Sequence, residues 1–396
     1  MKIFLTGLLS LEMHRLENGN IGNWYIASAV LKQLVNQGFE VVTTWQIHDS
    51  TLERIGVRDG VQILPIDSTN WTEASVVLEV NGDLWGDNST LLGEERLKNQ
   101  LLRTQRAQQE GMRTAIIATS PGPFAKTAQL EQLAREVFES YDLVVCREPY
   151  SAREIVAAGF SNSNLHVLPC PSVLFDEEVS SHAIRELDQL KTNYRVQQKI
   201  GISISAWNIA HANWDDNEFS EMQLKPITTI VYNILEQGDL PVLISHSNGF
   251  SVDSGLFVQT QGRDRKLIDA IIRSIGESAS QVFVISDLPP ADIWKILGNL
   301  DMIIAGRVHA GAAAVAQGVP AQFIFYANGP FAAKVQGFAE IFHQPPSISL
   351  QSCSDSTQII VEAAIKHQKA EAQRQDLVAV IRQQSKMQFD LVATLT

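Results

Sequence analysis

The stretch from residue 298 to residue 326 limits most strongly what this chain can fold into. It reads GNLDMIIAGRVHAGAAAVAQGVPAQFIFY. The short apolar run 302–305 ends at Gly306 and is typical of a fully buried strand in a parallel sheet. Residues 310–316 are nearly all alanine or glycine, which predicts a helix slim enough to approach the sheet closely before Gly318-Val319-Pro320 ends it. The stretch therefore predicts a strand–helix–strand unit of an α/β fold.

Two polar residues, Arg307 and His309, lie on the turn between this predicted strand and helix. In an open α/β sheet, ligands bind beyond the carboxyl ends of the strands, next to helix N-termini. A helix N-terminus adds partial positive charge at that position. We therefore expect Arg307 and His309 to hold an anionic ligand.

The whole pattern resembles the polysaccharide pyruvyl transferase family, whose hallmark is an Arg-x-His turn followed by Gly-x-Pro. It consists of Asp301, the apolar strand, Arg307-Val308-His309, the small residues, Gly-Val-Pro, a strand ending at Tyr326, and Lys334. The resemblance covers roughly residues 21–334 and is strongest over 301–326. It implies a GT-B-like α/β fold, in which two Rossmann-like doubly wound domains face each other across a cleft.

A glycine-bearing loop with Asn20 and Asn23 separates the first predicted strand, 2–6, from the first helix. Glycines allow a backbone to approach a ligand, and asparagine can hydrogen-bond a sugar or cap the helix. Ordinary turn chemistry explains the loop equally well. The resemblance favours ligand binding, because the family carries an Asn-x-Gly loop here, usually with aspartate at the position of Asn23.

Two further strand ends carry polar side chains. Asp83 follows the buried strand 74–80, where the family often has a second glycine, and either a ligand or a plain turn accounts for it. Arg147 follows the strand 143–146, where its fork of donors suits a phosphate, although it can also pair with Glu148. The run that begins at Arg147 resembles the family's Arg-Asp-x-x-Ser segment. We expect both residues to bind substrate.

His246 ends the predicted strand 241–245, and the resemblance places it on the substrate side, although a buried structural histidine fits as well. Lys334 lies eight residues after Tyr326 and is expected to contact the anionic substrate. Cys170-Pro171 stands where the family usually has Asp-Pro. No histidine is paired locally with Cys170 and buried thiols are usually inert, so a nucleophilic role is not expected.

The length of 396 residues indicates two domains. The polar stretch 176–199 contains no predicted buried strand and marks the boundary. We expect residues 1–180 to form the first Rossmann-like domain, on the acceptor side. Residues 196–345 form the second, donor-binding domain with the Arg-x-His motif, and 346–396 form a helical tail that packs back across both domains.

The formal net charge of −13 argues against nucleic-acid and anionic-membrane partners, which need a basic face. Three cysteines give no even disulfide framework, and no His-x-x-x-His or Cys-x-x-Cys pair predicts a metal site. No apolar run approaches the ~20 residues of a membrane span. We expect a cytoplasmic protein without stable membrane insertion; a homo-oligomer stays open.

The resemblance implies transfer of a pyruvyl group from phosphoenolpyruvate to a sugar or glycan precursor, with no cofactor. Arg307 and Arg147 suit the anionic groups, Lys334 adds a point charge, and His309 suits proton transfer. Two alternatives are a GT-B glycosyltransferase or epimerase that uses a nucleotide sugar, and a non-catalytic sugar-binding relative, which Cys170 and Asn23 favour. The acceptor sugar is not specified by the sequence.

Overall fold

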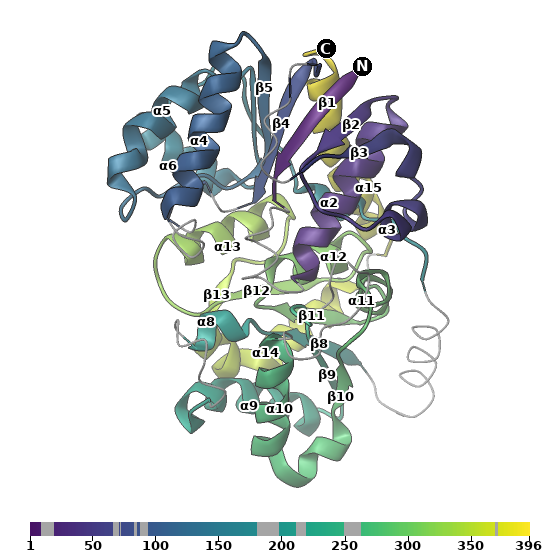
Figure 1. Cartoon of the computed structure of the whole chain (residues 1–396). Coiled ribbons are helices and arrows are strands. Elements are labelled where there is room, and N and C mark those ends of the chain that lie inside the picture. Colours follow the sequence, from purple (N-terminus) through teal and green to yellow (C-terminus); the bar gives the residue numbers. More distant parts are fainter. Residues whose placement is uncertain are drawn as a thin grey trace.

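The computed structural model describes most of the chain. The described residues are 1–8, 20–65, 71, 73–82, 85–87, 94–179, 198–210, 219–248, 263–368 and 371–396. Two separate parallel sheets form the two halves of the molecule (Figure 1).

The first sheet has seven strands in the order β3-β2-β1-β4-β5-β6-β7. The strands are β1 (Lys2–Gly7), β2 (Glu40–Thr43), β3 (Val61–Ile63), β4 (Val76–Gly82), β5 (Arg113–Thr119), β6 (Leu143–Cys146) and β7 (Leu165–Val167). The main helices are α2 (Ile21–Asn36), α3 (Asp49–Arg54), α4 (Glu94–Gln109), α5 (Glu131–Glu139) and α6 (Pro149–Ala157), with a 3-10 turn η4 (Pro171–Leu174) after β7. Its central strands are buried, as their apolar runs predict.

The second sheet has six strands in the order β10-β9-β8-β11-β12-β13. They are β8 (Lys199–Ser203), β9 (Leu240–Ile244), β10 (Phe283–Ile285), β11 (Met302–Ala305), β12 (Ala321–Phe325) and β13 (Ile348–Ser349). The helices are α8 (Ala206–Ala210), α9 (Glu221–Glu236), α10 (Arg263–Ile275), α11 (Pro290–Leu297), α12 (Val308–Val315) and α13 (Pro330–Ile341). Counted from its own first strand, each sheet follows the Rossmann order 3-2-1-4-5-6. The predicted doubly wound architecture is confirmed.

The slim helix predicted from alanine and glycine is α12, and it packs directly on β12. A Cβ atom on Gly311 would lie 2.5 Å from a ring carbon of Phe323. Only a residue without a side chain allows this distance between helix and sheet. The close packing places the first turn of α12, with His309, against the end of the sheet.

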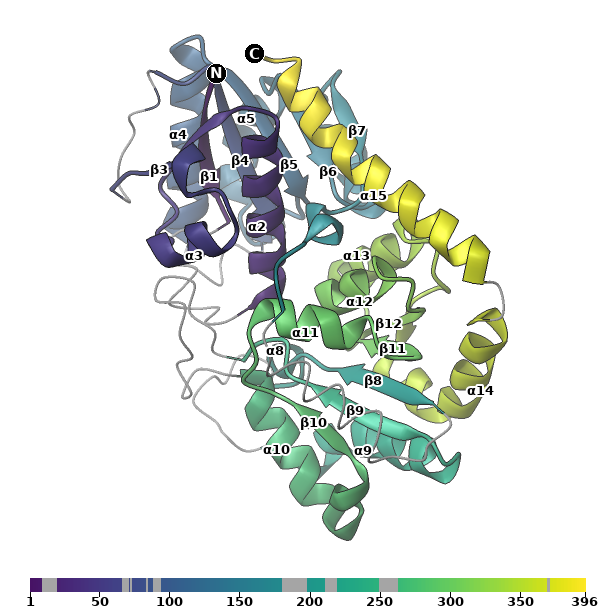
Figure 2. The same ribbon diagram turned by 90° about the vertical axis from the view of Figure 1, so that its right-hand side faces the viewer.

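The two C-terminal helices return to opposite halves of the molecule. Helix α14 (Leu350–Gln368) covers the second sheet, whereas α15 (Glu371–Ala393) runs beside β6 and β7 of the first sheet (Figure 2). Ser385 in α15 donates a hydrogen bond to the carbonyl oxygen of Cys170 at 3.3 Å. The predicted packing of the tail across both halves is therefore observed.

The predicted division into segments 1–180, 196–345 and 346–396 stays a prediction. Most of the predicted boundary, residues 180–197, lies outside the described residues. Among the helices that the structure describes, none is long and apolar enough to cross a bilayer.

Candidate active site

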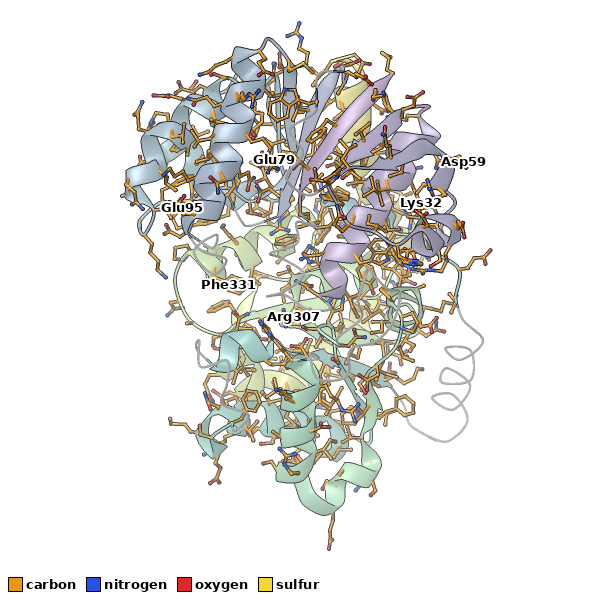
Figure 3. The ribbon with its side chains drawn as sticks, viewed as in Figure 1. Lys32, Asp59, Glu79, Glu95, Arg307 and Phe331 are labelled. Atoms are coloured by element: carbon orange, nitrogen blue, oxygen red, sulfur yellow. The ribbon has the colours of Figure 1, made fainter. Side chains whose placement is uncertain are left out.

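Arg307 is the N-cap of α12 and is held by a buried carboxylate. Its Nε and Nη2 donate to Oδ2 and Oδ1 of Asp264 at 3.0 and 2.7 Å, which is the two-pronged geometry that arginine makes with carboxylates. Arg307 directly follows the end of β11, and Figure 3 shows it in the second half of the molecule. The predicted place of Arg307 between a buried strand and a helix N-terminus agrees with the structure, and its binding of an anionic ligand stays a prediction.

His309 lies in the first turn of α12 and reaches the first half of the molecule. It packs against the start of α2, where a Cβ atom on Gly22 would lie 2.3 Å from its Nδ1 atom. Its Nε2 atom lies 3.4 Å from Nη1 of Arg147 and 3.8 Å from Sγ of Cys170. Glycine at position 22 is therefore needed to seat the histidine, and Arg147 and His309 meet across the interface between the sheets.

The hydrogen bond with Arg147 determines the tautomer of the His309 ring. A guanidinium nitrogen only donates hydrogen bonds, so Nε2 accepts from Arg147 and the proton is on Nδ1. Burial lowers the pKa of His309 well below its usual value, and the positive charges of Arg147 and Arg307 lower it further. The ring is thus a neutral imidazole at neutral pH.

Cys170 has a histidine neighbour that its local sequence does not indicate. The expectation that no histidine pairs with this thiol considered nearby residues only, whereas His309 comes from 139 positions away. Cys170 is fully buried at the start of η4. This contact does not contradict the absence of a histidine close in sequence, and the expected lack of a nucleophilic role stays a prediction.

Arg147 follows β6, as predicted, and its guanidinium makes contacts of three kinds. Nε donates to Oγ of Ser120 at 2.9 Å, Nη1 meets His309, and the guanidinium carbon lies 5.1 Å from the centre of the Phe338 ring. The neighbouring carboxylate of Glu148 caps α6 by accepting from the backbone N–H of Ser151. Residues from both halves of the molecule therefore hold the Arg147 guanidinium in place.

Lys334 lies in α13 and is buried at the interface between the two halves. Its Nζ donates to the carbonyl oxygens of Ser120 and Gly122 at 2.9 and 2.7 Å, both in the loop after β5. These bonds fasten α13 of the second half to a loop of the first. The predicted contact of Lys334 with an anionic substrate stays a prediction.

The asparagines near the first helix lie close to the same interface. Asn20 caps α2 through its side-chain oxygen, which accepts from the backbone N–H of Gly22 at 3.1 Å, and it pairs with Ser247 in an antiparallel bridge. Asn23 donates its backbone N–H to the carbonyl oxygen of Asn20. The capping alternative for Asn20 is thus observed. Asp83 lies outside the described residues.

His246 is fully buried where β9 ends. Its ring lies edge to face with Tyr25, with ring centres 5.5 Å apart. Among the described residues, neither ring nitrogen has a hydrogen-bond partner. Burial lowers the pKa of His246 well below its usual value, and the nearby positive charge of Arg307 acts in the same direction. Substrate binding by His246 stays a prediction.

Three contributors to the site were absent from the sequence prediction, namely Ser120, Phe338 and Asp264 as a partner of Arg307. Ser120 follows the strand 113–119 directly, and that position is a signal that could have identified it. Phe338 lies within an apolar helix, where the sequence offers no signal. Asp264 precedes Arg307 by 43 residues, and only folding shows the pair.

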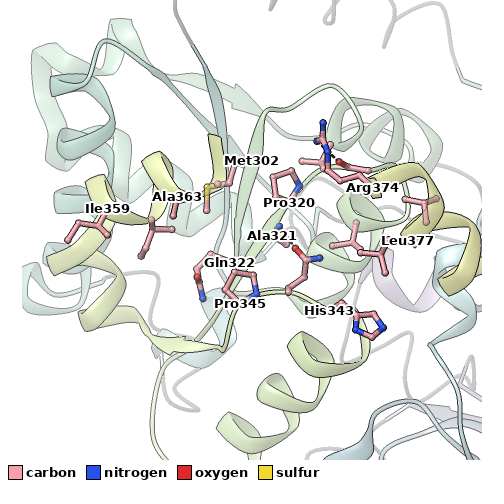
Figure 4. A pocket seen from close by; sticks show the side chains of 17 residues that line it. Met302, Pro320, Ala321, Gln322, His343, Pro345, Ile359, Ala363, Arg374 and Leu377 are labelled. Carbon is pink, nitrogen blue, oxygen red and sulfur yellow. Dashed lines mark hydrogen bonds between the residues drawn. The ribbon is translucent and has the colours of Figure 1, made fainter. Parts of the chain in front are cut away.

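A separate cavity of about 740 Å³ opens at the opposite, amino edge of the second sheet (Figure 4). Its lining is mainly apolar and includes Met302, Pro320, Ile359 and Leu377, with Arg374 at one side. Arg374 donates to the carbonyl oxygen of Gly318 at 2.9 Å. This cavity is not part of the candidate active site, because Arg307 and His309 follow the carboxyl ends of the strands.

Acid should destabilise the fold through the buried histidines. An unfolded histidine binds a proton near pH 6.5, whereas the folded pKa of His309 is lower, so the unfolded state takes up more protons as the pH falls below about 6.5. We expect the free energy of unfolding, measured with urea at several pH values between about 7.5 and 5.5, to fall more steeply in the wild type than in His309→Gln. The two slopes should differ by up to about 1.4 kcal/mol per pH unit. His343→Gln, at an exposed position, should keep the wild-type slope. Equal slopes in the wild type and His309→Gln would contradict the lowered pKa.

A family model described as polysaccharide pyruvyl transferase matches residues 20–327. No curated protein sequence matches the chain. Similar solved structures include sucrose-phosphate synthase from Thermosynechococcus elongatus, with 10% identity, a TM-score of 0.56, and coverage of 99% of this chain and 98% of that one. HepE from Anabaena in complex with UDP-glucose has 13% identity and a TM-score of 0.53, with coverage of 98% of this chain and 99% of that one. A UDP-N-acetylglucosamine 2-epimerase from Listeria monocytogenes, described as putative, has 11% identity and a TM-score of 0.53, with coverage of 97% of this chain and 90% of that one. At such identities the likeness shows the fold alone, and that fold is GT-B.

Proposed function

Since the chain belongs to the polysaccharide pyruvyl transferase family, we propose that it transfers a pyruvyl group from phosphoenolpyruvate to two hydroxyls of a sugar or glycan precursor. The product is a cyclic pyruvate ketal. The observation that carries this proposal is the contact of Arg147 with a buried, neutral His309, whose pKa the charges of both Arg147 and Arg307 lower.

The reaction moves two protons and one phosphate. One sugar oxygen bonds to C2 of phosphoenolpyruvate while the methylene carbon gains a proton and becomes a methyl group. The second sugar oxygen then bonds to C2 as the C–O bond to phosphate breaks. One hydroxyl proton thus ends on carbon and the other on the released phosphate or solvent.

The donor carries a phosphate and a carboxylate, so its site needs fixed cations. Arg147 and Arg307 both lie at strand ends, in a largely buried position where electrostatic attraction is stronger than in water. The side chains around them are tied to both sheets, so the cations are held in place before the donor binds. Such preorganised charge stabilises the negative charge that develops on the leaving phosphate.

His309 is suited to move a proton once the donor is bound. The charges of Arg147 and Arg307 hold the pKa of His309 down, and a bound anion would offset both charges and raise that pKa. If the bound anion also draws the Arg147 guanidinium away from Nε2, that nitrogen becomes able to accept the proton of a sugar hydroxyl. Without donor, the ring stays neutral.

The test follows the released group. The protein is incubated with phosphoenolpyruvate and a panel of free and nucleotide-linked sugars, with phosphate release measured and the product examined for a ketal carbon by ¹³C NMR. Phosphate release that depends on the sugar, together with a ketal signal, supports the proposal. Release of a nucleoside diphosphate from a nucleotide sugar would point to the glycosyltransferase or epimerase alternative, and no turnover with any pair would favour a sugar-binding protein.

A further inference from the structure

The carboxylate of Asp264, in the first turn of α10, uses all of its capacity to accept hydrogen bonds. It is 1% exposed and accepts five hydrogen bonds within the described residues. Two come from Arg307, and three come from the backbone N–H groups of Ala206, His246 and Ser247 at 3.1, 3.2 and 2.9 Å. An ionised carboxylate offers about four lone-pair sites, so its accepting capacity is fully used.

These donors come from the ends of three neighbouring strands. Ala206 follows β8, His246 and Ser247 follow β9, and Arg307 follows β11, and the three strands are adjacent in the order β9-β8-β11. One carboxylate therefore fixes the positions of three strand ends relative to each other. Parallel strands direct their carboxyl ends to the same edge, where ligands bind.

The loop that Asp264 holds after β9 also touches the first half of the molecule. The carbonyl oxygen of His246 accepts from the backbone N–H of Ile21 at 3.2 Å, and Ser247 pairs with Asn20. The start of α2, which seats His309 at Gly22, is thus connected to the same loop. Asp264 therefore connects, through the His246 loop, to the segment that contacts His309.

We infer that Asp264 is a positioning residue that sets the direction of the Arg307 guanidinium and the place of the His246 loop, so that both meet one bound anion. The identity of that anion as phosphoenolpyruvate rests on the proposed function. The positioning itself rests on the five hydrogen bonds.

Replacing the carboxylate by an amide should weaken donor binding. In Asp264→Asn the new NH₂ group faces donors, and Arg307 loses its charged partner, so the affinity for phosphoenolpyruvate measured by calorimetry should fall about 10-fold or more. The matched control is Asp292→Asn. Asp292 is also 1% exposed and lies in the first turn of α11, a helix of the same half. Its variant should change the affinity less than about 2-fold, and an equal loss in both variants would overturn the inference.

A double-mutant cycle separates positioning from an independent effect. If Asp264 acts through Arg307, the double variant Asp264→Asn with Arg307→Lys should bind the donor little worse than the weaker of the two single variants. If the fold-losses in donor affinity of the two single variants multiply in the double variant, the two residues act separately and the inference is overturned.

A third measurement needs neither substrate nor the Asp264 variant. In ¹⁵N-arginine-labelled wild type, the Nε–H signal of Arg307, assigned by its loss in Arg307→Lys, should exchange slowly with water because Oδ2 of Asp264 accepts that proton. Fast exchange would overturn the inference. Slow exchange in a protein that binds no phosphoenolpyruvate would support the positioning while refuting the proposed function, so the two failures are distinguishable.

Discussion

His309→Gln should lower the turnover number by about 10²-fold or more, which is the usual scale for a positioned acid or base. Glutamine keeps a similar volume, and its side-chain oxygen can accept from Arg147 as Nε2 does, but it cannot take up a proton at neutral pH. Donor affinity should stay nearly unchanged, because Arg147 and Arg307 are retained. The measurement is kcat and KM in the phosphate-release assay, with donor affinity by calorimetry.

The comparison variant for His309 is His246→Gln. His246 is also buried and lies near Arg307, but it has no contact with Arg147 among the described hydrogen bonds. We expect this variant to affect KM for the acceptor or stability more than kcat. If both variants lose activity only in proportion to lost folded protein, His309 is structural and the pyruvyl-transfer proposal loses its main chemical support.

Arg147→Lys should lower kcat/KM by about 10²-fold although the positive charge is kept. The guanidinium holds Ser120 with Nε, His309 with Nη1 and the Phe338 ring with its flat face at the same time, and a single ammonium group cannot reproduce this geometry. The loss should appear in donor KM as well as in kcat, since the arginine is expected to grip the donor and also adjoins His309.

Arg153→Lys is the matched control for Arg147→Lys. Arg153 in α6 also bonds across the interface, to both carboxylate oxygens of Glu340 in α13, but its side chain is 59% exposed. Exposed ion pairs contribute little, so activity should stay within about 2-fold of the wild type. A loss as large as that of Arg147→Lys would mean that the substitution acts through domain packing and not through the site.

The strand–helix–strand unit at residues 302–325 was predictable because its signals are local. A short apolar run indicates a buried strand, and the alanine and glycine residues of α12 indicate a helix that packs close to the sheet. For the same reason the sequence placed Arg147 and Arg307 at strand ends and His309 at a helix start. The doubly wound order of both sheets was expected from the resemblance and is confirmed.

The alternatives at single residues needed the tertiary structure. The helix cap of Asn20 and the backbone partners of Lys334 depend on what lies opposite in space, and the substrate contacts expected of both residues stay predictions. In the structure Asn20 caps α2 and Lys334 bonds to two backbone carbonyl groups of the other half.

The sequence by itself determined the α/β class, the strand ends that carry cations, and the position of the histidine beside a helix N-terminus, because these follow from the pattern of neighbouring residues. Only the tertiary structure decided that Arg147 meets His309 across 162 positions, and that Asp264 holds Arg307. It also decided the lowered pKa of His309, which results from burial and from charges distant in the sequence. Contacts and electrostatic fields depend on distance in space, and a sequence records only distance along the chain.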